Sequence, residues 1–195
     1  MQETLSSKNK EMANTTDQYK EVVGRCMDLY VKKAKDYGTS WRVLRPISIV
    51  DQIYIKAWRI RQIQEKGVQK IQDSVESEFI GIVNYGIIAL IQMVIPPNSE
   101  TDLSTDEAKD WYEREAGKVE ELMLQKNHDY GEAWRDMRIS SITDIILMKL
   151  YRTKQIEDNQ GQTLISEGVE ANYRDMINYA VFVLIKLNFT SHEAH

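Results

Sequence analysis

The chain has 195 residues, of which 28% are charged and 42% belong to the hydrophobic class, values typical of a folded globular protein rather than a disordered one. The net charge of −5 excludes the basic excess that marks general nucleic-acid-binding proteins, so we expect no direct binding to nucleic acid. The most apolar run, Phe79 to Ile95, is shorter than the roughly 20 residues of a membrane span, so no membrane partner is expected. A lone cysteine, Cys26, and a polar N-terminus indicate a cytoplasmic protein without a disulfide framework.

The pattern of apolar residues predicts an all-α protein, because three prolines and nine glycines permit long helices and no strand-like alternation occurs. Each half of the chain contains three expected helices, which cover about 15–36, 46–67 and 71–95 in the first half and 105–129, 139–158 and 164–189 in the second. The organisation that follows is a flexible segment 1–14, a first repeat 15–95, a linker 96–104, a second repeat 105–189 and a tail 190–195.

The two halves are copies of one unit. The pattern Lys-x-x-Asp-Tyr-Gly-x-x-Trp-Arg begins at Lys33 and again at Lys126, a shift of 93, and residues 25–63 align with 118–156. After a one-residue insertion the shift becomes 94, and Asn84-Tyr85 aligns with Asn178-Tyr179. A three-helix unit of this size cannot easily bury its apolar third helix alone. We therefore expect the tandem repeats to pack about a pseudo-two-fold axis into one helical bundle.

Acidic and basic residues of the second repeat share helix faces when they are placed at about 100° per residue. Three helices would therefore supply them to one cleft. Carboxylates from different helices are the ligands that Mg²⁺ prefers, and lysine and arginine neutralise phosphate oxygens. The candidate metal ligands are Glu121, Asp129, Glu170 and Asp175, and the candidate phosphate-binding residues are Lys126, Lys149 and Arg152. As an alternative, these are solvated faces, with pairs such as Glu170 and Arg174 that only support a helix.

The candidate contacts with a nucleobase are Trp134, Asn178 and Tyr130. Each has a structural interpretation as well. Asn178 lies in the most apolar helix and would tie helices together through hydrogen bonds. Trp134 would cap the end of the bundle, and the Asp-Tyr-Gly sequence that contains Tyr130 is compatible with a helix terminus that ends on a left-handed glycine.

The copies differ at the acidic positions. Asp175 aligns with Gly81, and Glu157 aligns with Gln64. We therefore expect a partly decayed site in the first repeat and a more intact site in the second.

The second repeat carries a combination of motifs that resembles the nucleotide modification associated domain 1 family. The string is Lys126-x-x-Asp129-Tyr130-Gly131-x-x-Trp134, then Asp144, Lys149 and Arg152, then Glu170 and Asp175-Met176-x-Asn178-Tyr179-Ala180. The resemblance covers about residues 20–93 and 113–187, and it implies a role in nucleotide or DNA-base modification.

A looser similarity is to the all-α nucleoside triphosphate pyrophosphohydrolases, the MazG-like and dimeric dUTPase-like group. That group holds Mg²⁺ with Glu-x-x-Glu on one helix and Glu-x-x-Asp on another. Here Glu170 and Asp175 are five residues apart, and Glu167 with Glu170 has the Glu-x-x-Glu spacing on the wrong helix. The similarity is therefore one of architecture.

The function that we predict is the handling of a small nucleotide, with Mg²⁺ as cofactor and hydrolysis of a (deoxy)nucleoside triphosphate as the reaction. A first alternative is a non-catalytic module that binds a nucleotide or a protein partner. A second is a structural helical adaptor, in which the basic residues pair with acids inside the bundle. The sequence leaves open whether the chain forms a homodimer.

Overall fold

The computed structural model describes residues 2–68, 70, 72–96, 103–163 and 167–189, with side chains of the first helix described from Thr15 on. In these ranges the chain forms six α-helices, two short 3-10 helices and no strand, which confirms the predicted all-α class. The elements are α1 (Gln2–Tyr37), η1 (Ser40–Val43), α2 (Pro46–Lys66), α3 (Val75–Val94), α4 (Thr105–Tyr130), η2 (Ala133–Asp136), α5 (Ile139–Asp158) and α6 (Val169–Phe189).

Most helix ends follow the local signals in the sequence. Pro46 occupies the first turn of α2, and Gly67 closes that helix in the left-handed conformation. Ser104 and Glu107 form a capping box at the start of α4, where each side chain bonds the backbone N–H of the other.

Two predicted helix starts are wrong. The first helix begins at Gln2 rather than near residue 15. The expected flexibility of the segment 1–14 stays a prediction. The third helix begins at Val75 rather than near 71, because the Ser74 side chain accepts a hydrogen bond from the N–H of Ser77 and caps the helix there. The sixth helix was expected to begin at Leu164, a residue that lies outside the described residues. In the described residues, α6 begins at Val169.

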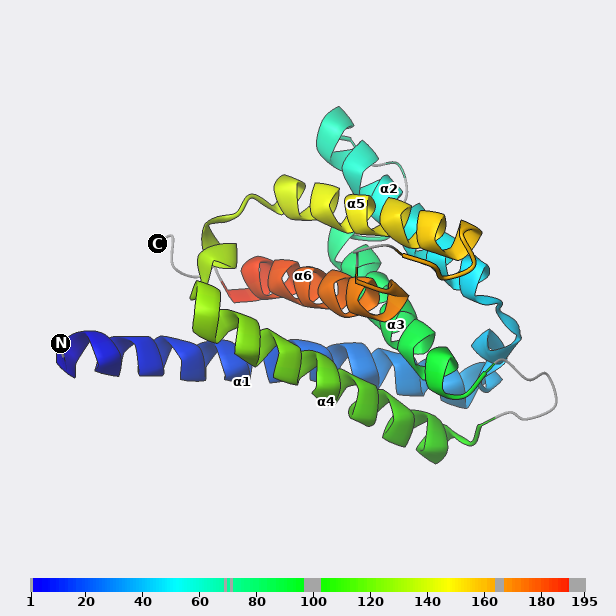
Figure 1. Cartoon of the computed structure of the whole chain (residues 1–195), viewed down its shortest axis with the longest axis horizontal. Helices are drawn as coiled ribbons and strands as arrows, with labels where there is room; N and C mark the ends of the chain where they lie inside the picture. The colour runs from blue at the N-terminus through cyan, green and yellow to red at the C-terminus, as the bar shows by residue number, and fades with distance from the viewer. Residues whose placement is uncertain (1, 69, 71, 97–102, 164–166, 190–195) are drawn as a thin grey trace.

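The helices pack as pairs of repeat counterparts, as Figure 1 shows. The two apolar helices α3 and α6 contact each other in the centre, α1 packs against α4 on one side, and α2 packs against α5 on the other. Among the described residues, α3 has the length and apolar composition of a membrane span, but most of it is buried inside the protein. The helix pairs therefore form the expected pseudo-two-fold arrangement around a shared core.

A reciprocal set of buried hydrogen bonds links the repeats. Asn84 of α3 donates to the Cys26 carbonyl (3.1 Å) and accepts from the Tyr112 hydroxyl of the other repeat (2.8 Å). Asn178 of α6 makes the same two bonds, with an α4 carbonyl (3.3 Å) and with the Tyr19 hydroxyl (2.7 Å). Burial raises the pKa of both tyrosines well above its ordinary value, so both hydroxyls stay protonated and remain donors.

Removing one of these hydroxyls tests the link between the repeats. Tyr112→Phe leaves the buried Asn84 carbonyl oxygen without its donor, so we expect the free energy of unfolding to fall by about 1–2 kcal/mol. Tyr19→Phe should cost a similar amount. Urea unfolding followed by circular dichroism measures both, with Tyr130→Phe, whose ring is exposed, as the control. If Tyr112→Phe and Tyr19→Phe are as stable as the control, these hydrogen bonds do not stabilise the association of the two repeats.

Candidate functional site

Each repeat contains a cavity at the place where its first helix ends. The first cavity, in the N-terminal repeat, has a volume of about 380 Å³, and the second, in the C-terminal repeat, about 360 Å³. Every residue that lines the second cavity has a repeat counterpart that lines the first. Identical side chains at these paired positions are Lys33 and Lys126, Tyr37 and Tyr130, Gly38 and Gly131, Trp41 and Trp134, Asn84 and Asn178, and Tyr85 and Tyr179.

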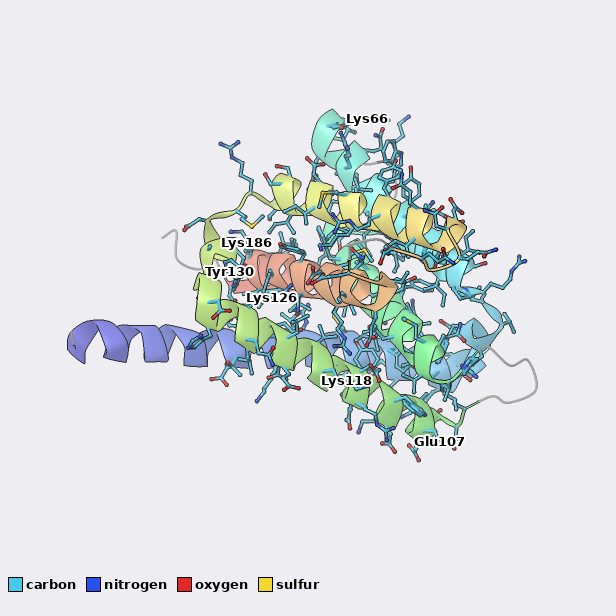
Figure 2. All side chains as sticks on the ribbon, in the orientation of Figure 1. Lys66, Glu107, Lys118, Lys126, Tyr130 and Lys186 are labelled. Carbon is cyan, nitrogen blue, oxygen red and sulfur yellow. The ribbon has the colours of Figure 1, made fainter. Side chains whose placement is uncertain are left out.

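The Asp-Tyr-Gly sequence shapes the mouth of each cavity. Gly38 and Gly131 have φ angles of 68° and 64°, which a residue with a side chain rarely adopts, and they turn the chain out of the helix. The 3-10 helix that follows carries the tryptophan into the cavity wall. Tyr130 is left 77% exposed at the end of α4, and Figure 2 shows it together with Lys126 on the part of α4 beside α6. Its counterpart Tyr37 is 57% exposed.

Trp134 forms a wall of the second cavity rather than a platform for a base. Phe182 stacks on it at 4.3 Å between ring centroids, and the Arg135 guanidinium lies 4.4 Å from the same ring. Two groups this close must cover opposite faces of the indole. A base therefore cannot stack on Trp134, although the interpretation of this residue as a base contact would require it. Its buried N–H has no hydrogen-bond partner within the described residues. The edge of the ring is therefore what a ligand would meet.

Asn178 has a structural role in addition to a place in the cavity wall. Both ends of its amide are held by the cross-repeat hydrogen bonds described above. The structural interpretation of this residue is therefore confirmed, and any contact with a ligand would use the remaining hydrogen-bonding capacity of the amide.

Asp175 lies between two lysines in the second repeat. One carboxylate oxygen is 2.5 Å from the Lys126 ammonium, and the other is 2.5 Å from the Lys149 ammonium. Asp175 and Lys149 are each only 8% exposed, whereas Lys126 reaches the surface. The structure thus brings together three of the residues that the sequence singled out, from three different helices. Lys126 and Asp175 line the second cavity, whereas Lys149 does not.

The other candidate metal ligands lie apart from Asp175. Glu121 is exposed, Asp129 lies beside His128 on the surface, and Glu170 pairs with Arg174 one turn along α6. Over the described ranges no three acidic, histidine or cysteine side chains are placed to hold a metal ion. The expected convergence of the four carboxylates is therefore wrong.

Helix geometry explains why the four carboxylates do not converge. Arcs of about 100° on single helices include both buried and solvent-facing positions. In addition, Glu170 and Asp175 are five residues apart on α6, which separates them by about 7.5 Å along the helix axis. Arg152 is likewise exposed and takes no part in the Lys126–Asp175–Lys149 cluster.

The first repeat keeps an acid near its cavity, one turn away from the aligned position. Gly81 replaces Asp175, but Glu78, which aligns with Asn172, binds the Lys56 ammonium at 3.2 Å. Arg59 also binds Glu78. The prediction of a partly decayed first site rested in part on the missing carboxylate at position 81, and it stays a prediction. The structure adds that a different carboxylate, Glu78, binds the lysine of the second helix in the first repeat.

Glu157 is a half-buried carboxylate at the C-terminal end of α5. Burial, followed by the nearby charges of Asp158 and Asp51, raises its pKa from 4.5 to about 7, and one of its oxygens has no hydrogen-bond partner among the described residues. Its repeat counterpart, Gln64, instead donates to the Thr143 hydroxyl at 3.1 Å. An amide is therefore tolerated at the equivalent place.

Comparison with known proteins identifies a family. The family model described as nucleotide modification associated domain 1 matches residues 33–93 and 126–187. Each matched segment starts at a cavity lysine, Lys33 or Lys126, and ends within the third helix of its repeat. No curated protein and no solved structure matches the chain.

Replacing Asp175 distinguishes a structural carboxylate from a metal ligand. Asp175→Asn leaves the buried Lys149 ammonium without its counter-ion, so we expect the free energy of unfolding to fall by about 3 kcal/mol in metal-free buffer. Glu170→Gln, which removes an exposed pair, should cost less than about 1 kcal/mol. Chemical unfolding in the presence of a chelator measures both. A gain in stability for Asp175→Asn under these conditions would indicate a carboxylate held ready for a metal.

Glu157 predicts a pH dependence of stability. Between pH 4.5 and about 7 the unfolded chain loses this proton before the folded chain does, so the free energy of unfolding falls as pH rises through that window. Glu157→Gln removes this loss. We expect the variant to melt at a higher temperature than the parent protein at pH 8 and at nearly the same temperature at pH 4.5. Glu121→Gln, which removes an exposed carboxylate, is the control, and an equal benefit at both pH values would contradict the assignment.

Proposed function

We propose that the chain binds the base of a nucleotide in the cavity of each repeat. The premise is that the chain belongs to the nucleotide modification associated domain 1 family, with one copy of the domain in each repeat. The observation that carries this proposal is the pair of equivalent cavities with the same lysine, tyrosine, tryptophan and asparagine in their walls.

The cavity tyrosines have no evident role in the fold. Tyr37 and Tyr130 expose most of their rings at the cavity mouths, where packing gives no reason for an aromatic side chain. Rings in such a place suit stacking on a planar base. Lys33 is also exposed, and an ammonium beside an aromatic surface suits a phosphorylated ligand, whereas its counterpart Lys126 is bound by Asp175.

The volume of the cavities and the free N–H of Trp134 agree with a ligand of the size of a nucleotide. Cavities of about 300–1,000 Å³ are typical of small-molecule sites, and volumes of about 360–380 Å³ lie at the low end, which suits one nucleotide. The buried Trp134 N–H would gain an acceptor from a ring nitrogen or a carbonyl oxygen of the base.

Mg²⁺-dependent hydrolysis of a nucleoside triphosphate, the reaction predicted from the sequence, has less support. The four carboxylates named for the metal do not form a ligand set, and Asp175 is already bound by two ammonium groups. The donor set therefore does not fit a resident Mg²⁺, and the hydrolytic reaction stays a prediction. Of the two functions, binding without turnover agrees better with the geometry.

A thermal-shift panel of ribo- and deoxynucleoside mono- and triphosphates, each with and without Mg²⁺, tests binding, and an assay for released pyrophosphate and phosphate tests turnover. We expect at least one nucleotide to raise the melting temperature, since a ligand at 100 times its Kd stabilises the folded state by about 2.7 kcal/mol. Release of pyrophosphate would show catalysis. If no nucleotide in the panel changes the melting temperature, the proposal is wrong.

The rim tyrosines provide a sharper test. We expect the double variant Tyr37→Ala and Tyr130→Ala to bind the best nucleotide of the panel about tenfold more weakly, because both bases lose their stacking partner. Both rings are exposed, so the fold should tolerate the change. Tyr151→Ala, at an exposed tyrosine outside both cavities, is the matched control in isothermal titration calorimetry. Unchanged affinity of the double variant would exclude the cavity mouths as the binding place.

A further inference from the structure

We infer that the two cavities have diverged in the charge of the group they accept. The first cavity binds phosphate, and the second cavity, in which Asp175 occupies the position of Gly81, does not bind it. The assignment of a nucleotide as the natural ligand rests on the proposed function. The anion site in the first cavity does not, because it follows from the charges and the space around Gly81.

The second cavity already contains its own anion. The Asp175 carboxylate is bound on one side by Lys126 and on the other by Lys149, at 2.5 Å each. A phosphate that approached these lysines would meet a carboxylate at close range, and like charges in a partly buried site repel strongly. Both lysines also have their ammonium groups engaged by Asp175. The charge of this cluster is therefore used within the protein.

The first cavity has no side chain at the corresponding position. A Cβ on Gly81 would lie 2.6 Å from the Lys56 side chain, which shows that Lys56 packs directly over the glycine. Lys56 consequently lines the first cavity, whereas its counterpart Lys149 does not line the second. The space that Asp175 fills in one repeat is occupied by a lysine in the other.

The repeats differ in where the carboxylate lies, because in each repeat one carboxylate binds two cations. Glu78 binds Lys56 and Arg59 but does not line the first cavity, whereas Asp175 binds Lys126 and Lys149 and lines the second. Lys33, at the position of Lys126, lines the cavity, is exposed, and forms no ion pair in the described part of the chain. Asp36 next to the mouth has an equivalent in Asp129, so it does not alter the difference between the repeats.

The remaining lining follows the same trend. The first cavity extends to Gln52 and Ser77, whereas the aligned residues of the second repeat are Ile145 and Ala171, which do not reach the second cavity. Polar side chains beside Lys33 and Lys56 suit the oxygens of a phosphate. The second cavity has no lining residue at these two positions and contains the Asp175 carboxylate, so it suits an uncharged base or nucleoside.

Titration with inorganic pyrophosphate at low salt tests the anion site without any nucleotide. We expect one binding site in the parent protein, and we expect Lys33→Glu to weaken binding at least tenfold. Lys32→Glu is the matched control, because the neighbouring lysine is exposed, lies outside the cavity and changes the net charge by the same amount. Absence of pyrophosphate binding, or loss of binding in Lys126→Glu instead of Lys33→Glu, would overturn the inference.

A gain of function provides the second arm. Asp175→Asn removes the internal anion while it keeps the size of the side chain, so the stoichiometry of pyrophosphate binding should rise from one site to two. A folded variant that still binds one equivalent would contradict the role of Asp175. Should this variant fail to fold, the comparison of Lys33→Glu with Lys32→Glu still decides the question.

Nucleotide titrations separate this inference from the proposed function. If pyrophosphate binds through Lys33 but no nucleotide or nucleoside binds, the anion site stands and the proposed function fails. If a nucleoside monophosphate binds with an affinity that Lys33→Glu leaves unchanged, the proposed function stands and the inference fails. We expect Lys33→Glu to weaken the monophosphate and to leave the unphosphorylated nucleoside unaffected.

Discussion

The structure depends on the burial of two polar asparagines in the two most apolar helices. Asn84 and Asn178 are 9% and 5% exposed, and an unsatisfied amide there would cost about 1–3 kcal/mol. Each amide is satisfied by a carbonyl of its own repeat and by a tyrosine hydroxyl of the other. This requirement fixes how the central helices sit against α1 and α4. Both asparagines also line the cavity of their repeat.

On this symmetric frame a small change in sequence separates the two sites. Both repeats place a buried or half-buried lysine of their second helix against their third helix, and each lysine has a carboxylate partner. The carboxylate comes from Glu78 in one repeat and from Asp175, one helical turn further along, in the other. With the carboxylate at Glu78 the lysine lines the cavity, and with the carboxylate at Asp175 the carboxylate lines the cavity instead of the lysine. The fold tolerates both arrangements because each satisfies the buried ammonium.

Much of the fold was predictable from the sequence, because the signals are local. Pro46, Gly67 and Ser104 mark helix ends by their backbone chemistry, and the repeat reveals which helices are equivalent. The site was predictable only in part. The meeting of Lys149 with Asp175 depends on how α5 packs against α6, and helix faces considered singly cannot show which side of a wide arc is buried. The tyrosines that bond the asparagines were missed although a signal existed, since Tyr19 and Tyr112 obey the same shift of 93.

The exchange of tyrosine hydroxyls between repeats has a consequence for the units taken singly. A lone repeat would bury an asparagine with half its partners missing and would expose the apolar surface of its central helix to water. Such a fragment could gain both partners only by associating with a second fragment, either its sibling or another copy of itself. The tandem chain can therefore be understood as a covalently joined dimer, in which the two halves differ at their sites while their interface is symmetric.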